Sequence, residues 1–327
     1  MSGTCGCGFP KRFAPPNRSP VSRPQHRRFA FPALLIGSTA LAFGPWLVRL
    51  ADVGPVAAGF WRLGLALPFL FVIAGLTGQA VHWPGRRLAA IAAVAGFFFA
   101  ADLAAWHVGI HLTKLGNATL FGNTSSLIFA AWGLWLARQQ PSPVQAGALG
   151  LAALGAGLLM GSSAELSLSH VRGDLLALFA GILYTGYLIA VQRARQSLQA
   201  LPMLFIASAF GAAMLLPFSL ALGEQVVPGN WTFVFVLALS SQVLGQGLLV
   251  YALGSLPPLV VGLTLLTQPA ISALVGWLAY GETLSPLDWI GAAAIAAALV
   301  LVRLPQRGVA DSGRAAQLSR HAGPESP

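Results

Sequence analysis

Two stretches of the chain decide its fold: residues 124–143, TSSLIFAAWGLWLARQQPSP, and residues 267–286, TQPAISALVGWLAYGETLSP. Laid over each other without a gap, they match at Thr124 with Thr267, Ala130 with Ala273, Gly133 with Gly276, Ser142 with Ser285 and Pro143 with Pro286. Each copy begins as an apolar run, and each is followed by one further apolar run. The pair therefore predicts an internal duplication of a membrane-spanning unit.

The composition around these stretches is that of a chain dissolved in lipid. Charged residues make up 9% of the sequence and hydrophobic residues 56%. Soluble domains carry about 25% charged residues, so this chain has too little polar surface to face water. The net charge of +10 does not indicate nucleic acid, because the basic residues lie in tails and short loops rather than along one face. We therefore expect an all-α membrane protein that binds no nucleic acid.

Spans are predicted wherever about 20 apolar residues run between polar or Pro/Gly breaks, since that length crosses the hydrocarbon core. The scan gives ten: Phe31 to Leu50, Pro55 to Leu76, Leu88 to Gly109, Lys114 to Leu136, Val144 to Gly161, Gly173 to Val191, Pro202 to Leu222, Thr232 to Leu253, Pro258 to Tyr280 and Pro286 to Val302. Hence ten transmembrane helices are expected, five in each half.

Basic residues predict the orientation, because Lys and Arg are retained on the cytoplasmic side. With the amino terminus inside, the outer loops hold only Arg49, Lys114 and Arg172. Both termini are then cytoplasmic, as an even number of spans requires. Five spans is an odd number, so the two halves are expected to be inverted relative to each other. Inverted repeats are typical of secondary transporters with a site near the midplane.

The predicted boundaries divide the chain into four parts. Residues 1–30 form a disordered cytoplasmic arm, residues 31–161 the first five-helix repeat, residues 173–303 the second, and residues 304–327 a disordered cytoplasmic tail. Gly157 and Gly161 form a GxxxG pattern. That pattern favours close helix packing and sometimes a homodimer, so the oligomeric state stays open.

The segment from Gln268, QPAISALVGWLAYGETLSPLDWIGAAAIAAALVLV, resembles the closing signature of the EamA-type transporters of the drug/metabolite transporter superfamily. The resemblance rests on Pro269, the Gly281–Glu282 pair and Gly291, together with residues 60–62, which resemble the family's entry to its second helix. It covers about residues 31–303. The first half departs from the pattern with Gln139, where the family often has Glu. The resemblance implies that spans 1, 3, 4, 6, 8 and 9 surround a cavity while spans 5 and 10 are peripheral.

Two ionisable residues fall inside predicted spans, where a charge is costly and usually faces a cavity or a partner. A rise of 1.5 Å per residue puts Arg62 and Asp102 at about the same depth, each roughly 10 Å below the outer end of its helix. They are predicted to form an intramembrane charge pair. Alternatively Arg62 extends alone to the headgroups, or Asp102 carries protons as a coupling ion.

Several uncharged polar residues are predicted to lie at a second common depth in the membrane, near its midplane. Six of them lie within roughly 6 Å of the midplane by the same count: Asn123, Ser126, Tyr184, Gln242, Gln246 and Gln268. Any one of these could simply bridge two helices, but six at one level predict a solute-binding pocket. Tryptophans could form its walls, namely Trp46, Trp61, Trp106, Trp132, Trp135 and Trp277, and Trp106, one turn after Asp102, is the candidate for solute contact.

The sequence lacks the residue patterns that would indicate a metal-binding protein or an enzyme. No His, Cys, Asp or Glu cluster has metal-ligand spacing, so no metal or other cofactor is predicted. No Ser or Cys is paired with a base at membrane depth, which disfavours an enzyme. The predicted function is a secondary transporter, an exporter by resemblance, of small amphipathic organic metabolites such as amino acids, in the cell inner membrane. A channel or a subunit of a larger membrane complex is the alternative.

Overall fold

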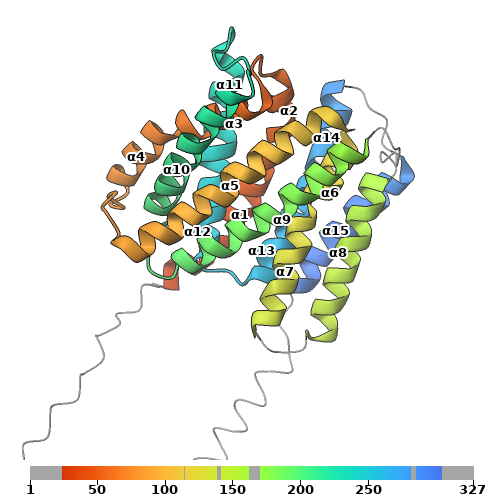
Figure 1. Ribbon diagram of the computed structural model, residues 1–327. Coiled ribbons are helices and arrows are strands. Elements are labelled where there is room, and N and C mark those ends of the chain that lie inside the picture. The colour runs from red at the N-terminus through yellow and green to blue at the C-terminus, as the bar shows by residue number, and fades with distance from the viewer. Residues whose placement is uncertain (1–23, 114, 138–140, 162–169, 281–284, 304–327) are drawn as a thin grey trace, which may run out of the picture.

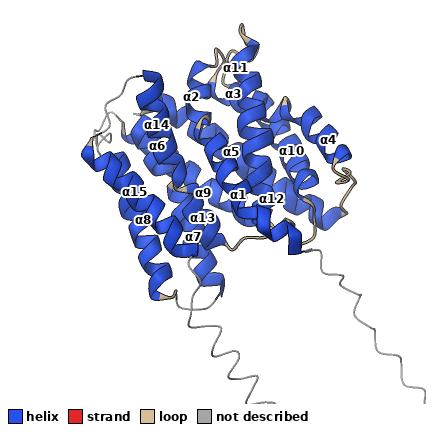
Figure 2. Ribbon diagram, turned by 180° about the vertical axis from the view of Figure 1, so that it is seen from behind, coloured by secondary structure: helices blue, strands red, loops and turns tan. Residues whose placement is uncertain are grey.

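The computed structural model describes residues 24–113, 115–137, 141–161, 170–280 and 285–303, and over these it contains helices and connecting turns with no strand (Figures 1 and 2). The helices are α1 Pro24–Ala42, α2 Gly44–Leu50, α3 Pro55–Gly64, α4 Ala66–Leu76, α5 Arg86–Leu112, α6 Leu115–Gly122, α7 Thr124–Ala137, α8 Pro143–Gly161, α9 Val171–Ala194, α10 Ala200–Ala221, α11 Trp231–Leu237, the π-helix η1 Ala238–Gln246, α12 Gly247–Leu253, α13 Pro258–Leu265, α14 Thr267–Tyr280 and α15 Pro286–Arg303. The predicted all-helical class is confirmed. Gln139, Gly281, Glu282 and both terminal tails, residues 1–23 and 304–327, lie outside the described residues.

Six helical segments are long and apolar enough to cross a membrane. They are Arg28–Leu50, Pro55–Leu76, Arg86–Leu112, Val171–Ala194, Ala200–Ala221 and Trp231–Leu253. Four further apolar helices are shorter: Thr124–Ala137, Pro143–Leu158, Pro258–Ser272 and Pro286–Val302. Six of the predicted spans overlap the segments of membrane length, and the other four overlap the shorter apolar helices.

Several spans are interrupted near their middle, and prolines account for three of the interruptions. The breaks at Phe43, Leu65 and Leu266 separate α1 from α2, α3 from α4 and α13 from α14. Each precedes a proline by two or three residues, at positions 45, 68 and 269. Proline has no N–H and cannot bond the carbonyl four residues earlier, so backbone acceptors are freed where the helix bends.

Two more interruptions have no proline. The fourth span breaks at Asn123, between α6 and α7, directly after Gly122. The eighth winds as the π-helix η1 between α11 and α12, which follow one another without a gap in the chain. Such π-helical turns are rare and often occur at functional sites. Half-helices of this kind are also how membrane proteins place backbone polar groups around a cavity.

The helices pack as a main bundle with one pair at its edge. In the main bundle α5 lies along α9, and α1 lies along η1 and α12, while α10 packs on α3, α4 and α5. Phe99 of α5 and Tyr187 of α9 stack at its centre, with ring centroids 4.5 Å apart and planes tilted by 17°. The helices α8 and α15 form the edge pair, on the right in Figure 1 and on the left in Figure 2.

Glycine allows the edge pair to pack closely, but the glycine is not the one predicted. A Cβ at Gly155 would lie 2.7 Å from the carbonyl oxygen of Gly291, so α8 and α15 touch there through their backbones. A Cβ at Gly157 would meet nothing within 4 Å. Close packing within the chain therefore uses Gly155, and Gly157 of the predicted GxxxG pattern faces away from it.

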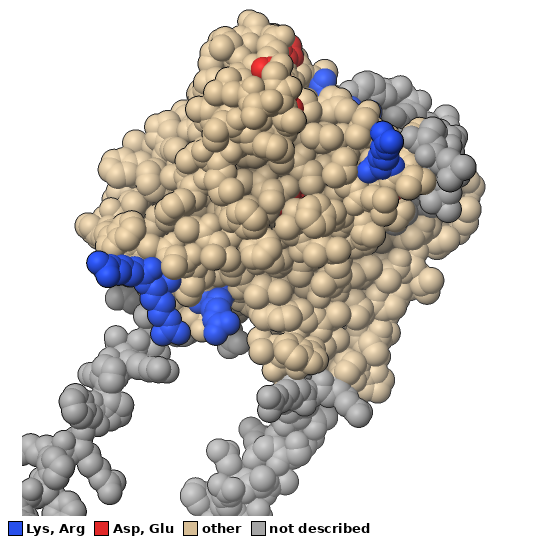
Figure 3. Space-filling model, in the orientation of Figure 1, with Lys and Arg blue, Asp and Glu red and all other residues tan. Residues whose placement is uncertain are grey.

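The outer surface suits a lipid environment. On the face in Figure 3, Lys and Arg lie toward the lower end and at the upper right, Asp and Glu lie at the upper end, and uncharged residues fill the broad belt between. Large apolar side chains are exposed on the surface of the protein, including Leu154, Leu278 and Val300, each with at least 62% of its surface accessible. The protein is therefore a multi-pass membrane protein, since exposed apolar area of this extent is unfavourable in water.

Candidate functional site

A cavity with an empty volume of about 620 Å³ lies where the interrupted helices meet. It is lined by Leu41, Gly44, Arg62, Phe99, Asp102, Leu103, Trp106, Gly122, Asn123, Ser125, Ser126, Tyr184, Gln246, Leu265 and Gln268. Gly44, Asn123 and Leu265 each lie at or beside a helix break, so the breaks direct backbone as well as side-chain polar groups into the cavity.

Six of the seven residues predicted to bind solute line this cavity: Trp106, Asn123, Ser126, Tyr184, Gln246 and Gln268. They come from five spans, and the helices α8 and α15 contribute nothing among the described residues. The lining includes Arg62 of the second span, which the predicted ring of spans did not contain.

The side chains of Gln246, Tyr184 and Tyr187 form a hydrogen-bonded network at one side of the cavity. The Gln246 side chain donates from Nε2 to the Tyr184 hydroxyl at 3.0 Å and accepts at Oε1 from the Tyr187 hydroxyl at 3.2 Å. Tyr187 stacks on Phe99, and the guanidinium of Arg62 lies 5.6 Å from the centroid of the Phe99 ring. Each of these contacts holds the next side chain in place, so the amide and hydroxyl groups on this side of the cavity have fixed positions.

The two membrane charges face the same cavity but do not touch. Arg62 and Asp102 are 5% and 9% exposed. No nitrogen of Arg62 comes within 4.0 Å of a carboxylate oxygen in the part of the chain that the structure describes, and its Nε is buried without a hydrogen-bond partner. Both side chains line one cavity, and their helices α3 and α5 pack against each other, yet the two side chains form no salt bridge.

Trp106 is the tryptophan that lines the cavity, at the turn after Asp102. Its ring lies against the backbone at the α6–α7 break, where a Cβ on Gly122 would stand 2.9 Å from the indole Nε1. The other candidate tryptophans lie elsewhere. Trp135 and Trp277 are 75% and 45% exposed, and Trp61 donates to the Val226 carbonyl at 2.6 Å in the loop before α11.

Gln242 is the predicted solute-binding residue outside the cavity lining. It is fully buried, and its amide nitrogen donates to the Ser208 hydroxyl at 2.9 Å, which ties η1 to α10. Gln242 and Gln246 both lie on the π-helix η1, but their amides have different partners: Ser208 for Gln242, and Tyr184 and Tyr187 for Gln246.

Two further residues of the site region were not among the predicted site residues. His107 is fully buried, and its Nδ1 lies 2.8 Å from the Pro55 carbonyl oxygen at the start of α3. Ser125 lines the cavity next to Ser126, and its hydroxyl donates to the Gly122 carbonyl at 3.0 Å. The residue type of Ser125 is unremarkable in a span, and only its place after the break distinguishes it.

No group of three His, Cys, Asp or Glu side chains that could hold a metal ion occurs among the residues described by the structure. The cavity instead offers one cation, one carboxylate, amides, hydroxyls and aromatic rings. This donor set can bind an organic solute through hydrogen bonds and charge, with Leu41, Leu103 and Leu265 as the apolar wall.

Comparisons with known proteins bear on the fold and on the family of the chain. Of the solved structures, 29 chains match, and one of them, a crystal structure, has a TM-score of 0.70 at 17% identity over 86% of this chain and 98% of that chain. At that identity the likeness shows the fold alone. No curated protein matches the sequence. The sequence pattern of the EamA-like transporter family matches residues 171–304, the second half of the chain. This stretch of the chain is therefore similar to the EamA-type transporters of the drug/metabolite transporter superfamily, and the match supports a transporter of that type.

Proposed function

We propose that the chain is a ten-span secondary transporter, non-enzymatic, with residues 31–161 and 173–303 as inverted five-helix repeats. The observation that carries the proposal is the polar cavity at the meeting point of interrupted helices inside an apolar bundle. Membrane proteins tolerate irregular backbone at depth only where it lines a cavity or is covered by protein. In secondary transporters such half-helices surround the solute.

Matching contacts in the two halves support the inverted repeat. Ser38 of α1 lies 3.1 Å from the hydroxyl of Thr267, the first residue after the break in the ninth span. A Cβ on Gly181 of α9 would stand 2.6 Å from the hydroxyl of Thr124, the first residue after the break in the fourth. Thr124 and Thr267 are the first matched pair of the sequence repeat, and the same offset relates Ser38 to Gly181.

Helix caps repeat in the same way at opposite ends of the bundle. Glu224 follows α10 and accepts hydrogen bonds from the N–H groups of Val56 and Ala57, in the first turn of α3. Gln79 follows α4 and accepts one from the N–H of Leu201, in the first turn of α10. Each capping residue comes directly after a glycine with a φ of +69°, Gly223 and Gly78. We call these two contacts the reciprocal caps.

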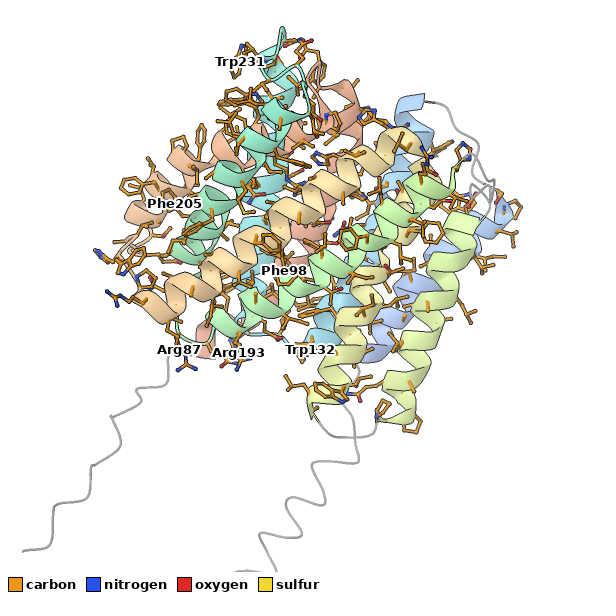
Figure 4. The ribbon with its side chains drawn as sticks, viewed as in Figure 1. Arg87, Phe98, Trp132, Arg193, Phe205 and Trp231 are labelled. Carbon is orange, nitrogen blue, oxygen red and sulfur yellow. The ribbon has the colours of Figure 1, made fainter. Side chains whose placement is uncertain are left out.

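For orientation, we propose that both termini are cytoplasmic and that the protein lies in the cell inner membrane. Arg87 and Arg193 lie at the lower end of Figure 4 and Trp231 at the upper end, as expected if the lower end is inside. Reporter fusions after Arg195 and Arg303 should read cytoplasmic, and a fusion after Glu224 periplasmic. A cytoplasmic reading after Glu224 would contradict the ten-span topology.

The proposed solutes are small amphipathic organic metabolites such as amino acids, moved outward by alternating access around the cavity. Purified protein in liposomes tests this with labelled L-leucine, L-phenylalanine and L-methionine in counterflow. A saturable flux is expected for at least one of them. A flux that rises linearly with concentration would indicate a pore, and no flux in any case would favour a subunit role. Metabolite leakage from cells with and without the gene tests the direction.

A matched pair of variants ties the flux to the cavity. Asn123→Trp places a large ring in the cavity, whereas Ile128→Trp places the same ring on α7, where Ile128 is 40% exposed. We expect Asn123→Trp to abolish the saturable flux and Ile128→Trp to preserve it. Equal flux in the two variants, measured per folded molecule, would remove the cavity from the transport path.

A further inference from the structure

The two membrane charges, Arg62 and Asp102, line one cavity without forming a salt bridge with each other. The guanidinium of Arg62 lies 5.6 Å from the centroid of the Phe99 ring, and its Nε is buried without a hydrogen-bond partner. Asp102 accepts no hydrogen bond from any group that the structure describes. A buried charge with no partner is strongly unfavourable, so in a purely structural role the two side chains would be expected to meet directly.

We propose that Arg62 and Asp102 are the two poles of the solute site, and that the solute is a dipolar molecule with an anionic group for Arg62 and a cationic group for Asp102. This rests on the proposed function, because it names the substrate class of the same cavity. The guanidinium presents several N–H donors to an anion, and the carboxylate presents only acceptors to an ammonium group. A solute that carries both groups gives Arg62 an anionic partner and Asp102 a cationic partner at the same time.

The rest of the cavity fits the remainder of such a solute. The Tyr184 oxygen already accepts from Gln246, which leaves its O–H proton for a solute acceptor. Leu103 and Trp106, which flank Asp102 in the lining, add apolar surface on the same helix. Leu41 and Leu265, on two other spans, add further apolar lining for the side chain of such a solute.

Binding to the purified protein tests this without transport. The probes are leucine, phenylalanine and alanine, each with the amine that lacks its carboxylate and the acid that lacks its ammonium group, for example 3-methylbutylamine and 4-methylpentanoate for leucine. Thermal stabilisation against probe concentration gives apparent affinities. One dipolar probe should bind at least about tenfold more tightly than both of its relatives, as losing one charged hydrogen bond implies.

Single variants then assign each pole. In Arg62→Gln the preference for the dipolar probe over its amine should fall to about onefold, while the preference over its acid remains. In Asp102→Asn the pattern should reverse. Arg87→Gln and Asp52→Asn remove the same charges at exposed positions and should change neither ratio.

The results that overturn the proposal do not depend on the variants folding. If no dipolar probe binds wild-type protein better than both of its relatives, the poles are wrong, even where the liposomes show saturable flux of another solute. Unchanged ratios in both variants, with only lower stability, would make Arg62 and Asp102 structural. Saturable flux missing for every solute refutes the transporter instead, so the two failures are distinguishable.

Discussion

Replacing Glu224 by Ala should destabilise the protein more than replacing Gln79 by Ala, because the reciprocal caps differ in charge and in number of bonds. Glu224 accepts from two backbone N–H groups, at 3.2 and 2.8 Å, and places a carboxylate at the positive end of α3. Loss of such a cap costs about 0.5 to 2 kcal/mol, and the charge at the helix end adds about 0.3 to 1. Gln79 accepts one neutral bond at 3.2 Å, worth about 0.5 to 1.5 kcal/mol.

The free energy of unfolding can be measured by titrating the protein in mild detergent with SDS and following tryptophan fluorescence. Glu224→Ala should lose about 1 to 3 kcal/mol and Gln79→Ala about half of that, with Glu224→Gln between wild type and Glu224→Ala. Val227→Ala is the control, because Val227 lies in the same loop and is 68% exposed. A loss in Glu224→Ala no larger than in Val227→Ala would refute the capping role.

A second substitution tests the same contact from the other side. A Cβ at Gly54 would overlap the Glu224 side chain, so Gly54→Ala should displace the cap and destabilise the protein. Once Glu224 is Gly, which has no Cβ, that overlap is gone. The double variant should therefore lose less than the sum of the two single losses. Additive losses would mean that Gly54 and Glu224 act independently.

Gly262→Ala should cost about 1 to 3 kcal/mol of stability, since a Cβ there would overlap the backbone of α7. Gly157→Ala is the control, because a Cβ there would meet nothing within 4 Å, and it should change stability by less than about 0.5 kcal/mol. Equal shifts of the thermal unfolding midpoint in the two variants would contradict the close packing at Gly262. Gln242→Ala should lower the amount of folded protein and leave the apparent solute affinity of the remainder unchanged, because its amide bonds α10 outside the cavity. Gln246→Ala should alter affinity or selectivity per folded molecule by freeing two tyrosine hydroxyls, and kinetics identical to wild type would exclude it from the site.

The spans were readable from the sequence because apolar runs of membrane length are distinct from anything else in a chain. Prolines at 45, 68 and 269 also mark positions near which a helix must bend. The break at Asn123 and the π-helix η1 carry no such mark. They arise from packing between distant spans, as where Gly181 of α9 approaches the start of α7.

The depth of a residue in the membrane was predictable, and its lateral position was not. Counting the rise along each helix puts Asn123, Tyr184 and Gln268 at one level, and the structure brings them to one cavity. The same count puts Gln242 at that level, yet its side chain bonds Ser208 instead. Likewise, equal depth could not tell whether Arg62 and Asp102 touch, because the distance between two helix axes depends on side chains elsewhere.

The reciprocal caps imply that neither half is structurally self-sufficient. Residues 31–161 produced alone would leave the backbone N–H groups at Val56 and Ala57 without their carboxylate, and residues 173–303 alone would leave Leu201 without its amide. Two separately encoded halves should each be degraded when expressed singly and accumulate when expressed together. A single half inserted in both orientations could likewise cap an upside-down copy of itself, so an antiparallel pair of identical five-helix chains is a workable ancestor for this architecture.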